Sequence, residues 1–169
     1  LPRQDQKGFQ DTIRFGSVHP QALNVALADG FVFLHGCENR PGEGPVGRIT
    51  LARPERRNAI TVAMYAALAD AIEQAASDEA VRVITFRGEG QDFAAGNDLA
   101  DFLEAAPRLD DEIPVWRLLR ALATCEVPLV AAVHGNCVGI GTTMLLHCDL
   151  VVADEPARFS MPFVDLGLV

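Results

Sequence analysis

The chain has 169 residues, 49% of them apolar and 22% charged, so it is long enough to bury one core of ordinary size. Its net charge of −9 and its scattered basic residues argue against binding to the phosphate backbone of a nucleic acid. No apolar run is as long as a transmembrane helix requires and no signal peptide is visible at the start, so we expect a cytoplasmic protein that does not bind membranes.

The first 45 residues carry the weakest pattern. One apolar run over 31–34 precedes a stretch rich in Gly and Pro, which is typical of a hairpin from about residue 25 to residue 50. The residues before that run show neither helical nor strand periodicity and could equally form a flexible extension. We therefore expect two parts, an extension or hairpin over 1–45 and a core over 46–169.

The core alternates segments with strand patterns and segments with helix patterns. Pro54 ends the first strand, and Thr61 can cap a helix whose apolar residues recur on one face. In chain order we predict strand 48–53, helix 61–76, strand 81–87, helix 113–125, strand 129–133, a glycine-rich turn over 135–141, helix 142–147 and a buried strand 150–153. This order predicts an α/β fold in layers with right-handed crossovers.

The cysteines show no pattern typical of a metal site or a disulfide framework. Cys37, Cys125, Cys137 and Cys148 lack C-x-x-C spacing, and the last two lie in apolar segments. We expect reduced thiols in the core and no metal.

Two segments at strand ends are candidate anion-binding loops, because turns after buried strands hold backbone N–H groups that are free to bind a ligand. The first, 92–99, is rich in small residues and leads into a helical pattern; alternatively, Asn97 or Asp98 only caps that helix. The second, 134–143, holds three glycines but matches neither a Walker loop nor a dinucleotide-binding motif. Those glycines could instead serve close packing between a helix and a strand.

Three blocks in order carry a resemblance to one family. Residues 53–59 (RPERRNA), 93–99 (FAAGNDL) and 130–149 resemble the three conserved blocks of the crotonase, or enoyl-CoA hydratase/isomerase, superfamily, and the similarity extends over 46–169. The resemblance implies a crotonase-like α/β spiral core of ββα units, whose C-terminal helical part is missing here. It also implies an acyl-CoA substrate, no separate cofactor, and assembly as homotrimers or dimers of trimers.

The resemblance also assigns roles to residues. In the family, one backbone N–H from each loop polarises the thioester carbonyl, and by position these are the amides of Asn97 and Ile140. A basic residue of the first block lies near the coenzyme A nucleotide, which favours Arg57, with Arg53 or Arg56 as alternatives; an exposed arginine can also be only a solvated charge. The other residues expected against the substrate are Ala59, Ala95, Gly96, Asp98, Leu99, Gly139, Gly141, Thr143 and Phe163.

The acid and base that hydratases of the family need are absent from their usual positions. Those positions hold Thr143 and Phe163, neither of which can exchange protons near neutral pH, so standard hydration is contradicted. The sequence is similar instead to the isomerase branch, which shifts a 3-enoyl to a 2-enoyl double bond with one carboxylate. We expect that base beyond Val169, in a longer protein of which this chain is a truncated part.

Within the chain, Asp165 is the best substitute for the base, ahead of His134 and Asp98. An enoyl-CoA isomerase is therefore the leading hypothesis. A catalytically silent subunit or fragment that binds acyl-CoA is the alternative, and hydrolysis or decarboxylation of a thioester is a third possibility, since one oxyanion hole serves several reactions.

Overall fold

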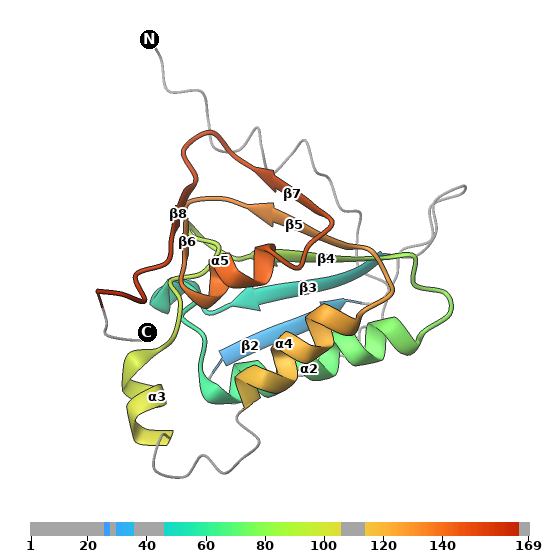
Figure 1. Cartoon of the computed structure of the whole chain (residues 1–169), viewed down its shortest axis with the longest axis horizontal. Coiled ribbons are helices and arrows are strands. Elements are labelled where there is room, and N and C mark those ends of the chain that lie inside the picture. Colours follow the sequence, from blue (N-terminus) through green and yellow to red (C-terminus); the bar gives the residue numbers. More distant parts are fainter. Residues whose placement is uncertain (1–25, 28–29, 36–45, 106–113, 166–169) are drawn as a thin grey trace.

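A computed structural model describes residues 26–27, 30–35, 46–105 and 114–165 (Figure 1). Its strands are β1 (Ala26–Leu27), β2 (Gly30–His35), β3 (Val46–Ala52), β4 (Val83–Gly88), β5 (Leu129–Val133), β6 (Asn136–Val138), β7 (Leu150–Ala153) and β8 (Arg158–Ser160). Its helices are the 3-10 turn η1 (Pro54–Arg56) and α2 (Val62–Ser77), α3 (Leu99–Ala105), α4 (Pro114–Thr124) and α5 (Ile140–Leu145).

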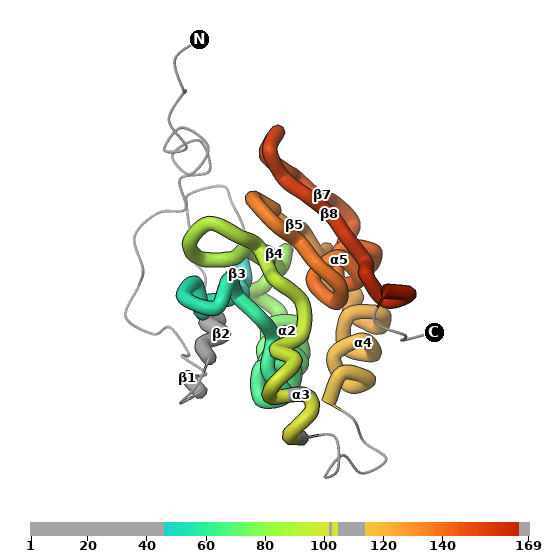
Figure 2. The backbone as a smooth tube through the Cα atoms, turned by 90° about the vertical axis from the view of Figure 1, so that its left-hand side faces the viewer, coloured from blue at the N-terminus to red at the C-terminus, as the bar shows by residue number. Residues whose placement is uncertain are grey.

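Six strands form one mixed sheet in the order β1-β2-β3-β4-β5-β7, an order that can be followed from β2 to β7 in Figure 2. The pair β2 and β3 is antiparallel, with Phe31 opposite Ala52, as the predicted hairpin requires. Residues 36–45, between the two strands, lie outside the described residues. From β3 to β4, β5 and β7 every pairing is parallel. The predicted α/β class is confirmed, and the loops that follow β3, β4 and β5 leave the sheet at one edge.

Helix α2 forms where its cap and its apolar spacing predict it. The Thr61 hydroxyl accepts a hydrogen bond from Met64 N at 3.2 Å, and Met64, Leu68 and Ile72, each within 1% of complete burial, line the inner face. Helices α2 and α4 lie side by side along the sheet (Figure 1). Burying a side chain of this size stabilises the fold by about 1.5 to 3 kcal/mol, so this layer supplies much of the core.

A second, two-stranded sheet was not predicted. Strand β6 forms within the segment expected to be only a turn, and it pairs in parallel with β8, with Cys137 opposite Phe159. The glycines around β6 hid its strand character, and a three-residue strand is too short to show alternation. Helix α5 also begins at Ile140, two residues before the predicted start at Thr142.

The prediction that strand 150–153 is buried was wrong. All four residues of β7 are exposed, with Leu150 at 55% and Val152 at 38%. The reason is topological, because β7 is the last strand of the large sheet and, within the described residues, pairs only with β5. Among the described residues, no helix combines the length and apolar character that crossing a membrane requires.

The cysteines inside the described part of the chain are free thiols. Cys137 is buried in the core, while Cys125 and Cys148 are partly buried against it. Burial raises the pKa of both the Cys137 and the Cys148 thiol to about 11, so neither forms a thiolate near neutral pH. Cys37 lies outside the described residues.

Candidate functional site

The segment after β3 is fixed by one asparagine side chain. Asn58 is completely buried. Both Asn58 and the preceding Arg57 adopt a left-handed backbone conformation, with φ values of 56° and 51°, respectively. Asparagine tolerates this conformation better than most residues. Its Oδ1 accepts from Arg53 N at 2.8 Å, and its Nδ2 donates to the carbonyls of Glu89 and Asp92, also at 2.8 Å. The first block is thereby joined to the loop after β4.

A buried carboxylate joins the loop after β4 to the loop after β5. Asp92 is 6% exposed, and its Oδ1 accepts from Asn136 N at 2.8 Å and from Asn136 Nδ2 at 2.5 Å. The backbones also pair, because Ala94 bridges to Cys137 and Val138 N donates to Ala94 O at 2.9 Å. Sequence patterns place the two loops at the ends of strands but do not reveal these individual contacts.

Glycines allow the two predicted loops to touch. Gly96 has φ +89°, and a Cβ there would lie 3.2 Å from the carbonyl oxygen of Val138. Gly139 has φ +55°, and its Cβ would lie 3.9 Å from the Gly96 Cα. At Gly141 a Cβ would come within 2.8 Å of the Ala94 Cβ, so this glycine does serve close packing, as one interpretation of the sequence expected. The residues that follow Gly96 and Gly139 are Asn97 and Ile140.

The backbone N–H groups of Asn97 and Ile140 have no acceptor among the described residues. Ile60 N donates to Gly96 O at 2.7 Å and Asp98 N donates to Ile60 O at 2.9 Å. Since a trans peptide is planar, the Asn97 N–H points opposite to the Gly96 carbonyl and therefore away from Ile60. Ile140 is the first residue of α5, where an amide has no partner within its own helix.

The side chain of Asn97 is held by a residue that the sequence did not indicate. The hydroxyl of Tyr65, on α2, donates to Asn97 Oδ1. Tyr65 is 3% exposed, and this burial raises the pKa of its phenol far above the ordinary value, so it stays protonated. A buried tyrosine usually needs a partner for its hydroxyl, which is the one signal in the sequence that could have drawn attention to it.

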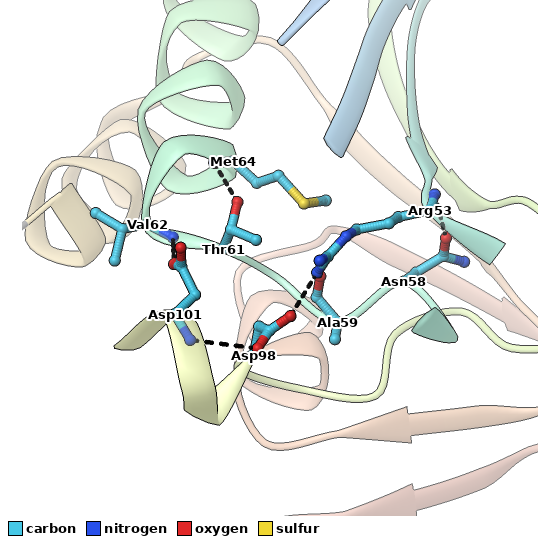
Figure 3. Close-up of polar contacts among 8 residues, drawn as sticks. All are labelled: Arg53, Asn58, Ala59, Thr61, Val62, Met64, Asp98 and Asp101. Atoms are coloured by element: carbon cyan, nitrogen blue, oxygen red, sulfur yellow. Dashed lines mark hydrogen bonds and ion pairs between the residues drawn. The ribbon is translucent and has the colours of Figure 1, made fainter. Parts of the chain in front are cut away.

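Asp98 serves structure, as the capping interpretation predicted (Figure 3). Its Oδ1 accepts from Asp101 N at 3.4 Å at the start of α3, and its Oδ2 lies 2.7 Å from Nη1 of Arg53. The hydrogen bond from Arg53 is the main reason that the pKa of Asp98 lies below its ordinary value. Asp101 in turn accepts from Val62 N at 2.6 Å, so the starts of α2 and α3 are joined.

Of the three arginines of the first block, Arg53 is bound to other residues, whereas Arg56 and Arg57 are exposed. Only 13% of the Arg53 side chain is exposed, and its guanidinium donates to Ala59 O at 3.1 Å as well as pairing with Asp98. The structure therefore argues against Arg53 as a coenzyme A cation. Arg56 is exposed. Arg57 is 74% exposed, and its Nε lies 3.9 Å from Asp92 Oδ2, so most of its charge faces solvent.

The predicted residues around the second loop lie close to the glycines. The Thr143 hydroxyl donates back to Gly139 O at 3.2 Å. Phe163 is partly exposed, and its Cε1 lies 4.0 Å from where a Cβ of Gly139 would be. Asp165 is exposed.

The other predicted residues are accounted for as follows. Ala95 is half-buried and its N–H donates to Arg57 O at 2.9 Å. Leu99 is 54% exposed at the start of α3. The ring of His134 contacts Gly90 O at 3.1 Å, so it is tied to a loop carbonyl.

Known proteins are similar to this chain in sequence and in fold. Residues 42–169 match the enoyl-CoA hydratase/isomerase family. The 2,3-dehydroadipyl-CoA hydratase of Escherichia coli (strain K12) is 40% identical over 124 residues, covering 72% of this chain and 48% of that protein. The peroxisomal enoyl-CoA delta isomerase 3 of Mus musculus is 34% identical over 132 residues, covering 75% and 41%.

A solved structure gives the same result. The enoyl-CoA hydratase/isomerase from Pseudoalteromonas atlantica T6c superposes with a TM-score of 0.70 at 42% identity, covering 83% of this chain and 52% of that one. The chain spans about half the length of the relatives it matches. Both the sequence blocks and the fold agree, and the chain belongs to the enoyl-CoA hydratase/isomerase family, the crotonase superfamily that its sequence resembles.

Proposed function

We propose that this site binds an acyl-CoA thioester and stabilises its enolate between the backbone N–H groups of Asn97 and Ile140. The observation that carries the proposal is the contact between the two loops: Gly96 and Gly139 approach each other, and the amide after each glycine has no acceptor within the described residues. An enolate carries its negative charge on one oxygen, and fixed N–H donors stabilise such a charge without reorganising; one of them is typically worth about 100- to 1000-fold in rate.

The remaining residues complete the binding proposal. Arg57 would pair with the phosphates of coenzyme A, because it is the basic side chain of the first block with 74% of its surface exposed beside the site. Ala59, Ala95, Leu99 and Phe163 would supply apolar contacts to the thioester and the acyl chain. Coenzyme A arrives as part of the substrate, so the proposal includes no separate cofactor. Homotrimeric assembly and a cytoplasmic location remain proposals that follow from the family and the composition.

For the reaction we propose a shift of a 3-enoyl to a 2-enoyl double bond. The relatives include both a hydratase and an isomerase at similar identity, so their names do not choose between the two reactions. The choice is supported by Thr143 and Phe163, which provide no acid and base pair for adding water. An isomerisation needs one carboxylate that removes and returns a proton. Asp165, exposed two residues after Phe163, is the candidate within this chain.

The test is binding and turnover by the intact protein. Calorimetry with an acyl-CoA should give saturable binding that weakens in Arg57→Ala, and 3-enoyl-CoA should be converted to 2-enoyl-CoA. Arg82, an exposed residue that follows α2 in the sequence, provides the control variant Arg82→Ala. Binding without any conversion would favour the alternative, a silent acyl-CoA-binding subunit. Absence of binding would refute the proposal as a whole.

A further inference from the structure

The single tyrosine of the chain is buried where its hydroxyl meets the candidate site. Tyr65 lies on α2 in the same core as Met64 and Leu68, and its hydroxyl donates to Asn97 Oδ1 across 32 residues of sequence. A buried hydroxyl needs a partner, and most side-chain polar groups find theirs in the backbone or in water. The partner here is instead the side chain of the residue whose backbone N–H is free.

Three contacts anchor Asn97 to the start of α2. Two act on its neighbours, because Gly96 O and Asp98 N both bond to Ile60. The third, from Tyr65, is the one that holds Asn97 itself. Gly96 lies at φ +89°, and glycine has the least conformational restriction of any residue, so this loop has little stiffness of its own. The direction of the Asn97 N–H therefore depends on these anchors.

We propose that Tyr65 is a positioning residue for the oxyanion hole: its hydroxyl holds the Asn97 carboxamide, and through it the direction of the free Asn97 N–H. The inference rests on the proposed function, since only there does this N–H meet an oxyanion. The contact also decides which end of the carboxamide is free. With Oδ1 bound to Tyr65, the partly negative oxygen is kept from a developing enolate, and the NH₂ end remains.

The tether does not depend on pH in the neutral range. Burial raises the pKa of Tyr65, so the phenol keeps the proton with which it donates to Asn97. A drop in activity after loss of this hydroxyl should therefore be the same at each pH at which the protein is folded and active.

The first experiment removes only the hydroxyl, by Tyr65→Phe in the intact protein. We expect kcat for enoyl-CoA conversion to fall about tenfold, less than for a deleted donor, with KM within about twofold, because the N–H is displaced but present. The matched control is Thr85→Val, which removes the hydroxyl that donates to Gly47 O at 3.3 Å and should keep kcat. A Tyr65→Phe enzyme with wild-type kcat overturns the proposal.

A double-mutant cycle then separates the contact from its members. Asn97→Ala removes the acceptor, so Tyr65→Phe and Asn97→Ala should each lower kcat, and the double variant should lose no more than the worse single one. Losses that multiply would mean that the two residues act independently, which also overturns the proposal.

Amide hydrogen exchange tests the Tyr65–Asn97 contact without measuring catalytic turnover. The Asp98 amide donates to Ile60 O, so Tyr65→Phe should speed its exchange about fivefold, the factor expected for one lost hydrogen bond. The Leu129 amide, which donates to Asp149 Oδ2 at 2.8 Å, should be unchanged. If the intact protein converts no enoyl-CoA, the proposed function fails while this measurement still decides the tether. Unchanged exchange at Asp98 would overturn it.

Discussion

Nη1 of Arg53 lies 2.7 Å from Oδ2 of Asp98, and this ion pair joins the segment after β3 to the start of α3. Both side chains are largely buried, with 13% and 15% of their surfaces exposed. Removing one partner leaves the other charge poorly solvated. Arg53→Met should therefore lower the free energy of unfolding by about 1 to 3 kcal/mol, measured by urea denaturation. Arg82→Ala, at an exposed position, should change it by less than about 0.5 kcal/mol.

The same pair predicts a dependence of stability on pH. Arg53 lowers the pKa of Asp98 in the folded protein, so the contribution is complete above the unfolded-state pKa of about 3.9 and is lost as the pH falls through the folded-state pKa. Asp98→Asn should be less stable than wild type at pH 7, and the gap should shrink below about pH 4. Denaturant melts at several pH values measure it; a constant gap down to acid pH would contradict the assignment.

Close packing between the two loops can be tested by moving a methyl group. A Cβ at residue 141 would lie 2.8 Å from the Cβ of Ala94, so Gly141→Ala should destabilise the fold by about 1 to 3 kcal/mol. Adding Ala94→Gly removes the opposing methyl and should restore part of the loss. Thermal melts of both variants measure this, and equal melting temperatures for the single and double variants would show that the strain lies elsewhere.

The proposed reaction predicts that water is not added to the substrate. With Thr143 and Phe163 in place of carboxylates, the intact protein should hydrate crotonyl-CoA at a negligible rate. The loss of absorbance of the conjugated thioester measures this rate. Hydration at ordinary enzymatic rates would exclude the assignment of an isomerase that lacks hydratase activity. Because Phe163 is only partly buried, Phe163→Glu should fold, so an attempt to build a hydratase with Thr143→Glu and Phe163→Glu can be interpreted.

Proline at residue 97 tests the proposed oxyanion hole, since it deletes the backbone N–H. That N–H has no acceptor in the described part of the chain, so the change breaks no backbone hydrogen bond of the fold. It also removes the side-chain acceptor of Tyr65, a loss that Asn97→Ala measures by itself. We expect Asn97→Pro to lower kcat about 100- to 1000-fold. Circular dichroism must show a folded protein. A main-chain donor alone would predict a silent Asn97→Ala, whereas the Tyr65 tether predicts the smaller loss described above.

Local signals predicted the elements whose causes are local. The Thr61 cap and the apolar face gave α2 within one residue at each end, and β5 was predicted at its observed bounds, because Pro128 precedes a short apolar run. The two loops of the site were predicted from small residues after strands. Their contact depends on the parallel order of β4 and β5, which the α/β pattern implied.

Features that depend on distant contacts could not be predicted in the same way. Strands β6 and β8 exist because they pair with each other, and neither carries a pattern of its own. The exposure of β7 follows from its place at the sheet edge, which an apolar run cannot reveal. Tyr65 lies on the buried face of α2, which helical spacing can indicate, but the partner of its hydroxyl comes from another loop.

Asn58 has a consequence for how the site resists deformation. Its carboxamide carries the same C=O and N–H groups as a main-chain peptide unit, and it uses them in three hydrogen bonds to two segments, the one after β3 and the loop after β4. One side chain thus supplies hydrogen bonds between two segments that are not paired through their backbones in a strand. Hydrolysis of that amide to a carboxylate would turn two donated bonds into a negative oxygen facing the carbonyls of Glu89 and Asp92. Such deamidation would weaken the link between the first block and the loop after β4, without any change at the residues proposed to meet the substrate.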